Sequence, residues 1–366
     1  MPDTLITLLE TIPDHRGLQG RHYPLPGFLI MALAAAMAGC DSLAAVSRFA
    51  QDLPVEMLRR LRFKKDKAPC HSAIHTILRG MDASALAQAL ERSFADGKPL
   101  GHVAVDGKIL HGSHRDPERP LQVLSAFCLR LNAVIGSIRV PQESNEIGAM
   151  IPLLSQLPLE GAIITADAFH AQRETCTYVT QQGGDYLFFV KGNQEQLRDA
   201  IAVCFSDEPR VRAQDIRSHT THDKGHGRIE QRSIQVSSEA VSFIGWPGCK
   251  QVCRIDRWRT VKGVETLQTI YAITSLPLDK AGPAELLKTA RDHWAIENKL
   301  HWIKDATFRE DKSTVRIANA ALSMAALRNA AIAILKQSGF HNMKAARQKL
   351  AAKPLNLWYD SLIRLH

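Results

Sequence analysis

The sequence shows no hydrophobic run that we expect to cross a membrane. The strongest candidate, GFLIMALAAAMAGC at 27–40, is shorter than the roughly 20 residues that a spanning helix needs. The stretch follows His15, Arg16, Arg21 and His22, which places it too far from the start for a signal peptide. It therefore predicts a buried helix, and we expect no membrane partner.

Paired cysteines, repeats and low-complexity tracts are also missing. The 7 cysteines are scattered without a C-x-x-C pair, which argues against a zinc ribbon or a disulfide framework and indicates a reducing compartment. At 366 residues, with 45% hydrophobic and 23% charged residues, the chain is long enough for two or three structural units with their own cores.

Positive charge is in excess. The formal net charge is +9 and the pI is about 9.3, and basic residues are dense in RRLRFKKDK at 59–67, namely Arg59, Arg60, Arg62, Lys64 and Lys65. This balance favours a polyanionic partner, because each phosphate that a protein neutralises releases counterions. A solvated basic face without a ligand explains the same charge.

The pattern of apolar residues predicts four regions. Residues 1–95 show helical spacing interrupted by proline and glycine, which predicts an all-α domain. Because it contains the basic run at 59–67, we expect this domain to bind DNA. Residues 96–194 predict three antiparallel strands and then alternating helices and strands, as in a mixed α/β sheet. We expect a β-rich insertion at 195–283 and helices that complete the core at 284–366.

Two aspartates follow apolar runs that read as strands. Asp106 is expected to end the strand HVAVD, and Asp167 the strand GAIITAD. Ends of adjacent strands can converge, and two carboxylates that close either share a proton or hold a cation. A hard divalent ion with oxygen ligands is the simplest occupant. Each aspartate alone is equally well a strand-end residue.

A third group of polar residues lies in the predicted helix 291–305. At about 100° per residue, one face carries His293, Glu297, His301 and Lys304. An apolar stripe lies beside it, made of Ile296, Leu300, Ile303 and Thr307. The polar face is either a site with a carboxylate and phosphate-binding groups or simply solvated. A zinc site is disfavoured, because the histidines are two turns apart.

Two further segments place basic residues after apolar runs. Lys191 begins KGNQ at 191–194, and Arg228 lies in HGRIEQR at 226–232. Both side chains are candidates to contact phosphate. A turn and a surface hairpin explain the same residues without function.

Several of these motifs resemble those of a known family. VAVDGKILHGS, ESNEI, ITADAFHAQ, DYLFFVKGNQ, HGRIEQR, HWAIENKLHWIKDATFRED and AALRNAAIAILK follow one another in an order similar to that of the insertion-sequence transposases that include the H-repeat-associated proteins. The resemblance covers nearly the whole chain. It implies a DDE transposase with a ribonuclease H-like core, and the predicted strand order agrees with such a core.

The resemblance also implies a metal site and its ligands. By motif, the catalytic and metal-binding carboxylates fall on Asp106, Asp167 and Glu297, which would bind two Mg²⁺ ions, with Mn²⁺ as a substitute. Related transposases carry Tyr and Arg where Ala290 and His293 stand here. Lys304 keeps its place, whereas Glu310 in FRED remains a rival for the third carboxylate.

The expected activity is metal-dependent cleavage and transfer of double-stranded DNA at insertion-sequence ends. His293, His301 and Lys304 would position phosphate together with Lys191, Arg228 and the basic run at 59–67. We expect a homodimer on DNA and a bacterial, cytoplasmic, nucleoid-associated protein. The alternatives are a catalytically silent DNA-binding relic and a nuclease without strand transfer.

Overall fold

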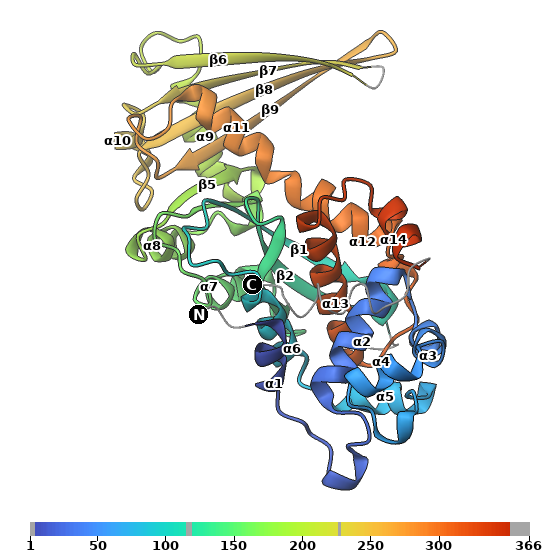
Figure 1. Ribbon diagram of the computed structural model, residues 1–366. Coiled ribbons are helices and arrows are strands. Elements are labelled where there is room, and N and C mark those ends of the chain that lie inside the picture. Colours follow the sequence, from blue (N-terminus) through green and yellow to red (C-terminus); the bar gives the residue numbers. More distant parts are fainter. Residues whose placement is uncertain (1–3, 115–118, 226–227, 352–366) are drawn as a thin grey trace. The chain divides into compact units, whose positions relative to one another are not determined.

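The computed structural model describes residues 4–114, 119–225 and 228–351. The chain divides into two compact units, which are treated separately below (Figure 1). The first, called the helical unit, comprises Met1–Lys98, Gly107–Asn145 and Ile296–His366. The second, called the sheet unit, comprises Pro99–Asp106 and Glu146–Ala295. The domain limits expected at 95, 194 and 283 stay predictions.

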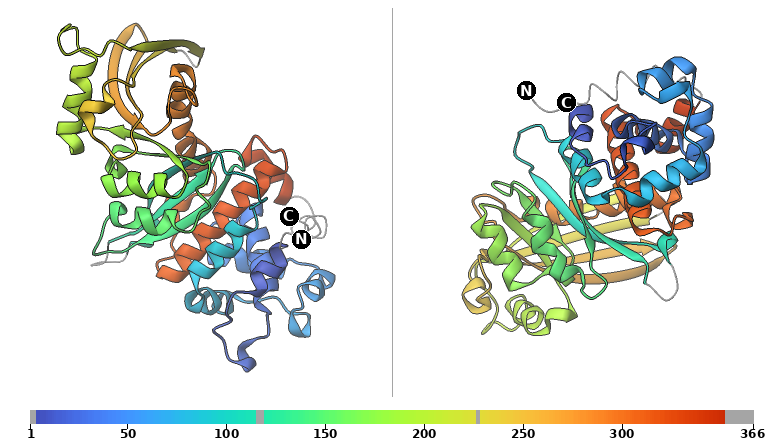
Figure 2. Two further views of the ribbon diagram at one scale, coloured as in Figure 1. Left: turned by 90° about the vertical axis from the view of Figure 1, so that its left-hand side faces the viewer. Right: turned by 90° about the horizontal axis from the view of Figure 1, so that it is seen from below.

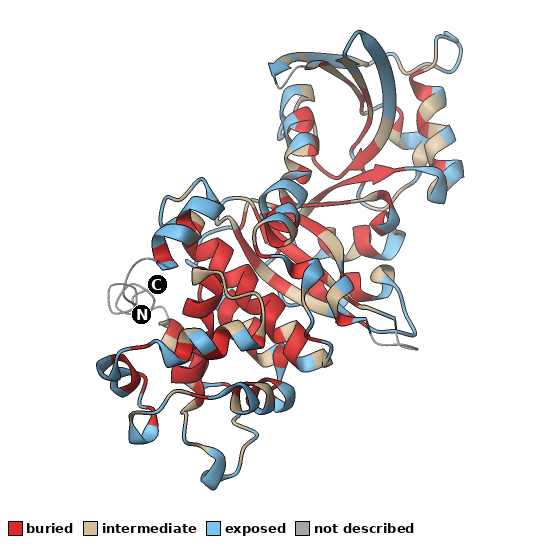
Figure 3. Ribbon diagram, turned by 90° about the vertical axis from the view of Figure 1, so that its right-hand side faces the viewer, coloured by how far each residue is buried: buried red, intermediate tan, exposed pale blue. Residues whose placement is uncertain are grey.

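Two apolar helices form the centre of the helical unit. Helices α2 (Leu25–Ala38) and α13 (Ala318–Gln337) pack against each other and are buried along most of their length (Figure 3). The predicted buried helix at 27–40 is thus confirmed. The surrounding helices are α1 (Leu5–Glu10), α3 (Leu43–Gln51), α4 (Val55–Arg60), α5 (His71–Gly80), α6 (Ala83–Arg92), α12 (Trp302–Ala306) and α14 (Met343–Ala351).

Helix α13 is long and apolar enough to cross a membrane by length and composition, and 83% of its apolar window is buried inside the protein. It packs on α2, α5 and α6 of the same unit. A helix that is apolar on all sides is expected at the centre of a large core. We therefore interpret α13 as a core helix.

A hairpin of β2 (Leu121–Cys128) and β3 (Ala133–Val140) also belongs to the helical unit. The two strands pair antiparallel, as predicted. The turn between them contains Asn132 with φ of 51°, a left-handed conformation that asparagine tolerates better than most residues. Helices α6 and α13 pack on β3.

The sheet unit is built on parallel strands at its centre. β1 (His102–Leu110) pairs in parallel with β4 (Ile163–Ala166), and β4 pairs in parallel with β5 (Asp185–Val190). Strand β1 continues beyond Asp106 into residues of the helical unit. The complete strand order is β3-β2-β1-β4-β5-β9-β8-β7-β6. This order confirms the predicted mixed sheet with flanking helices, and its first five strands follow the expected ribonuclease H-like arrangement.

The region after β5 extends the same sheet. Strand β9 (Val264–Thr274) pairs antiparallel with β5, and β8 (Gln251–Val261), β7 (Arg228–Ser237) and β6 (Arg217–Gly225) follow outward (Figure 2). The strand β6 is polar, and the sequence gives no local signal for it, because its residues are mostly exposed and show no apolar alternation.

Helices complete the sheet unit. They are α7 (Glu146–Leu154), α8 (Arg173–Gln181), α9 (Glu195–Cys204), α10 (Val241–Ile244) and α11 (Pro283–His293). Helix α11 buries Leu286, Leu287 and Ala290 in a cluster with Ile234 and Cys253 of the sheet. Burying a leucine side chain contributes about 1.5–3 kcal/mol, which explains why α11 lies along this face.

Candidate metal and DNA site

Asp167 lies where β4 ends, as predicted. Its carboxylate caps a short 3₁₀ turn, η4 (Ala168–His170), by accepting a hydrogen bond of 2.6 Å from the Ala168 N–H. Lys191 donates to the same oxygen at 2.9 Å. Burial alone would raise the pKa of Asp167, but the hydrogen bonds from Lys191 and Ala168 outweigh it and lower this pKa. The carboxylate is therefore ionised at neutral pH.

The KGNQ segment holds the loop that carries Asp167. Asn193 donates a side-chain hydrogen bond to the Ala168 carbonyl at 2.7 Å, and Gln194 donates to the Ala171 carbonyl at 3.1 Å. Sequence reasoning selected Lys191 and overlooked these two amides. The sequence did contain a signal, because both amides belong to the KGNQ segment that follows the strand end.

Asp106 lies in the middle of β1, so the expectation that it ends its strand is wrong. β1 runs four residues further, to Leu110, because its other neighbour in the sheet is β2. The register still supports convergence with Asp167: Val105 stands opposite Ala166, so the next positions are Asp106 and Asp167. Adjacent strands lie about 4.8 Å apart.

Two histidines lie beneath these strand ends and share one hydroxyl. Thr165 on β4 is hydrogen-bonded to His102 Nε2 at 2.8 Å and to His293 Nδ1 at 3.1 Å. Burial lowers the pKa of each histidine to about 4, although Asp106 and Asp167 oppose this shift at His293. His293 is only 6% exposed and neutral at pH 7. It thus has neither the access nor the charge for the predicted phosphate contact, and packs against Phe189.

Glu297 lies in the helical unit, in a wider turn than expected. Residues Glu297–His301 form a π-helical turn, η6, between α11 and α12, where the sequence predicts one regular helix. The predicted apolar stripe is buried at Ile296, Leu300 and Ile303. On the polar side Glu297 is 57% exposed and lies 3.3 Å from Nδ1 of the buried His301. Like His293, His301 is too buried to meet phosphate directly.

Lys304 and Glu310 form a buried ion pair within the helical unit. Their charged atoms lie 2.9 Å apart, and Arg328 of α13 lies 3.4 Å from the other Glu310 oxygen. Burial favours the neutral acid, but the two cations lower the pKa of Glu310. Lys304 is 4% exposed, which argues against its predicted contact with phosphate. Glu310 is therefore already matched by two positive charges, and it is buried where Glu297 is exposed.

The remaining predicted DNA contacts lie at the surface where they are described. Lys191 is exposed, as are Arg59, Arg60, Arg62, Lys64 and Lys65 in and after α4. Arg59 forms an ion pair of 2.8 Å with Asp66, so part of this charge is balanced. Arg228 begins β7, and its side chain lies outside the described part of the chain, as do His226 and Gly227 of the same motif.

The donor chemistry of this strand edge suits a hard cation. Asp106 and Asp167 offer carboxylate oxygens at neighbouring positions, and oxygen ligands are those that Mg²⁺ and Mn²⁺ prefer. Two neighbouring carboxylates are best accommodated when a cation lies between them. The pair is therefore a candidate metal site.

Family models match two long stretches of the chain. The family described as "Transposase DDE domain" matches residues 98–334, and the one described as "DDE_Tnp_1-associated" matches residues 6–93. A solved structure of the piggyBac transposase synaptic complex with hairpin DNA is similar with a TM-score of 0.44 and 8% identity, covering 92% of this chain and 71% of that one.

Relatives in Escherichia coli (strain K12) are similar along nearly the whole chain. The putative protein YbfL is 31% identical over 345 residues. The H repeat-associated putative transposase YhhI is 30% identical over 347 residues. Each alignment covers 90% of this chain and 90% of the relative. Together, the family match over more than half of the chain and these long alignments show that the chain belongs to the transposase DDE domain family.

Proposed function

We propose that the protein is a DNA transposase that cuts and joins DNA strands at the ends of an insertion sequence. Family membership supports this function. The observation that carries it is the parallel register of β1 and β4, which brings Asp106 and Asp167 to neighbouring positions. Two carboxylates at neighbouring positions could hold a cation between them, as metal-dependent strand cleavage requires.

Asp106, Asp167 and Glu297 are the residues that would hold the metal, two Mg²⁺ ions or Mn²⁺ in their place. Metal bound there would activate an attacking hydroxyl and stabilise the departing oxygen of a phosphodiester. Lys191 balances the charge of Asp167 at 2.9 Å in the free protein. Because its ammonium is exposed, it can turn from this carboxylate to a DNA phosphate.

Double-stranded DNA is the proposed partner, both as element end and as target. The net charge of +9 supports it through counterion release. A homodimer follows from the need to hold two DNA ends together, and a cytoplasmic, nucleoid-associated location follows from the substrate.

Nicking and joining of supercoiled plasmid by the purified chain, with Mg²⁺ or Mn²⁺, tests this function. The wild type should cut and join DNA, whereas Asp106→Asn and Asp167→Asn should bind DNA without cutting it. Glu265→Gln, an exposed carboxylate on β9, is the matched control and should remain active.

The alternative functions predict other results. Cutting without joined products would indicate a nuclease. DNA binding without metal-dependent cutting, in a folded wild type, would indicate a silent relic of a transposase. A chain that neither binds nor cuts DNA would contradict the proposal altogether.

A further inference from the structure

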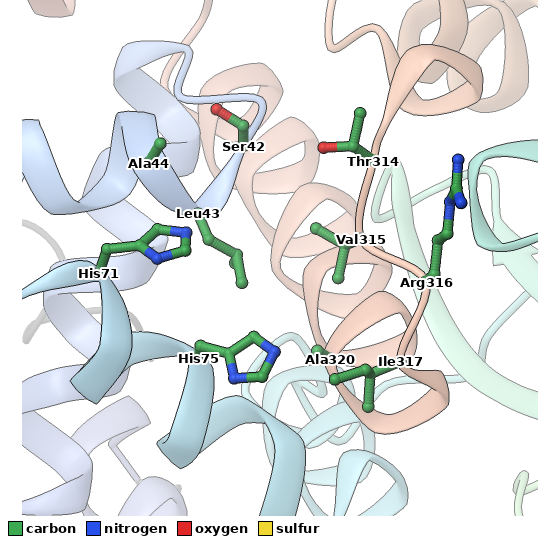
Figure 4. A pocket seen from close by; sticks show the side chains of 10 residues that line it. All are labelled: Ser42, Leu43, Ala44, His71, His75, Thr314, Val315, Arg316, Ile317 and Ala320. Atoms are coloured by element: carbon green, nitrogen blue, oxygen red, sulfur yellow. The ribbon is translucent and has the colours of Figure 1, made fainter.

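A second candidate site lies wholly within the helical unit. A cavity of about 390 Å³ opens between the start of α3, helix α5 and the segment that leads into α13 (Figure 4). Leu43 and Val315 contribute apolar surface to it. Its volume falls within the range of about 300–1,000 Å³ that is typical of small-molecule sites.

Basic side chains line this cavity and acidic ones do not. His71 and His75 are one turn apart on α5, and their rings point into the space, while Arg316 stands on the opposite rim (Figure 4). No aspartate or glutamate is among the lining residues. Within the described residues, no carboxylate forms an ion pair with Arg316. A cavity lined by one arginine and two histidines, and by no carboxylate, favours an anionic ligand.

The local backbone adds to this preference. Helix α5 begins at His71 and α13 at Ala318, and no side chain caps the first turn of either helix. The free N–H groups of a first turn and the helix dipole attract negative charge. Both features act in the same direction as the three basic side chains.

We propose that this cavity, here called the His71–Arg316 pocket, binds a backbone phosphate of DNA. The inference rests on the proposed function and deepens it by naming a DNA contact outside the carboxylate site. DNA is the favoured source of the phosphate, because the same unit carries the exposed basic residues Arg62, Lys64 and Lys65. A free phosphate ion shares the chemistry and is separated from DNA by the test.

The salt dependence of DNA binding tests the pocket. Binding of a short generic duplex by the full chain is measured by fluorescence anisotropy over a range of salt concentrations. The logarithm of the DNA-binding constant falls linearly with the logarithm of the salt concentration. For each phosphate contact that is lost, this slope should become less steep by about 0.9. We expect this change in Arg316→Gln and in the double variant His71→Gln, His75→Gln.

Matched controls are available in the same unit. Arg79→Gln changes an exposed arginine at the far end of α5, and His22→Gln an exposed histidine outside the pocket; both should leave the slope unchanged. Thermal melting checks that all variants fold. A slope that is the same in the pocket variants and the wild type overturns the proposal.

Titration of inorganic phosphate separates the two sources. Phosphate that binds the wild type, competes with DNA and no longer binds the pocket variants supports the proposal. Phosphate binding that the variants lose while their DNA slope stays unchanged would assign the pocket to a free anion and overturn the DNA contact. A wild type that binds no DNA at all would contradict the proposed function itself.

Discussion

Thr165 connects two buried histidines whose protonation makes the stability of the sheet unit depend on pH. Its hydroxyl is hydrogen-bonded to His102 and His293, and burial lowers the pKa of both histidines from 6.5 to about 4. Both are therefore neutral in the folded protein at pH 7. Because the unfolded chain takes up their protons first, folding stability is present above pH 6.5 and is lost as the pH falls toward 4.

The change His102→Gln should make this acid loss smaller. A histidine whose pKa is lowered from 6.5 to about 4 reduces the free energy of unfolding by on the order of 3 kcal/mol at a pH low enough to protonate it in both the folded and the unfolded state. The free energy of unfolding, measured with urea between pH 4 and pH 7, should therefore fall less steeply in the variant. His22→Gln, an exposed histidine, should match the wild type. Equal slopes in all three proteins would contradict the assignment.

In the helical unit, Glu91 makes folding stability depend on pH in the opposite direction. It lies on α6, accepts a hydrogen bond of 2.5 Å from Ser137 of β3, and burial raises its pKa from 4.5 to about 7. A raised pKa means that the folded state holds the proton longer. The favourable contribution is present below pH 4.5 and is lost as the pH rises through 7.

Glu91→Gln should remove this dependence while keeping an acceptor for Ser137. The stability of the variant relative to the wild type should grow between pH 4.5 and pH 7 and level off above, by about 3 kcal/mol in total. Thermal or urea unfolding at several pH values measures it. Glu143→Gln, an exposed carboxylate, should show no such growth. A relative stability that stays constant with pH would disprove the neutral state of Glu91.

At the scale of elements, the π-turn η6 separates what the sequence could predict from what it could not. The apolar stripe at Ile296, Leu300 and Ile303 was predictable, because helical periodicity encodes burial. The π-turn itself was not, because Ile296, Leu300 and Ile303 keep the spacing of a regular α-helix. The alignment of His293 with Glu297 was therefore predicted on a regular helix that the chain does not form.

The two candidate carboxylates near this turn should respond differently to substitution. Glu310→Gln removes the counter-charge of buried Lys304 and Arg328, so the free energy of unfolding should fall by about 3–5 kcal/mol. Glu297→Gln changes a 57% exposed side chain and should alter stability by less than about 0.5 kcal/mol, yet abolish DNA cleavage. Urea unfolding and plasmid nicking measure the two effects.

The reverse pattern would identify the other glutamate. A stable, inactive Glu310→Gln beside an active Glu297→Gln would make Glu310 the third carboxylate. Loss of both stability and activity in each variant would show that neither assignment is separable from folding.

At the scale of the whole molecule, the order of strands along the chain is encoded locally, whereas the pairing of strands in the sheet is not. Local alternation and turn residues predicted β2 to β5 and their order. Alternation could not show that the later strands join the same sheet through β5 and β9, because pairing partners far apart in sequence leave no local signal. Nor could it show that Asp106 lies within a strand, since that depends on β2 as a neighbour.

The proposed metal site makes a prediction about the two compact units together. Asp106 and Asp167 belong to the sheet unit and Glu297 to the helical unit, so metal held by all three should stabilise both. At a free Mn²⁺ concentration of 100 times Kd, the gain is about 2.7 kcal/mol. Hydrogen exchange should slow at β1 and β4 and also around η6.

Variants on either side of the proposed site distinguish shared ligation from a local effect. Asp167→Asn and Glu297→Gln should each abolish the Mn²⁺ effect in both units, because losing one ligand weakens the whole site. Glu265→Gln should keep it. Protection limited to β1 and β4, and unchanged in Glu297→Gln, would mean that the sheet unit binds metal alone and that the third carboxylate must be sought elsewhere. Protection in both units that is lost in either variant would instead support Glu297 as the third metal ligand.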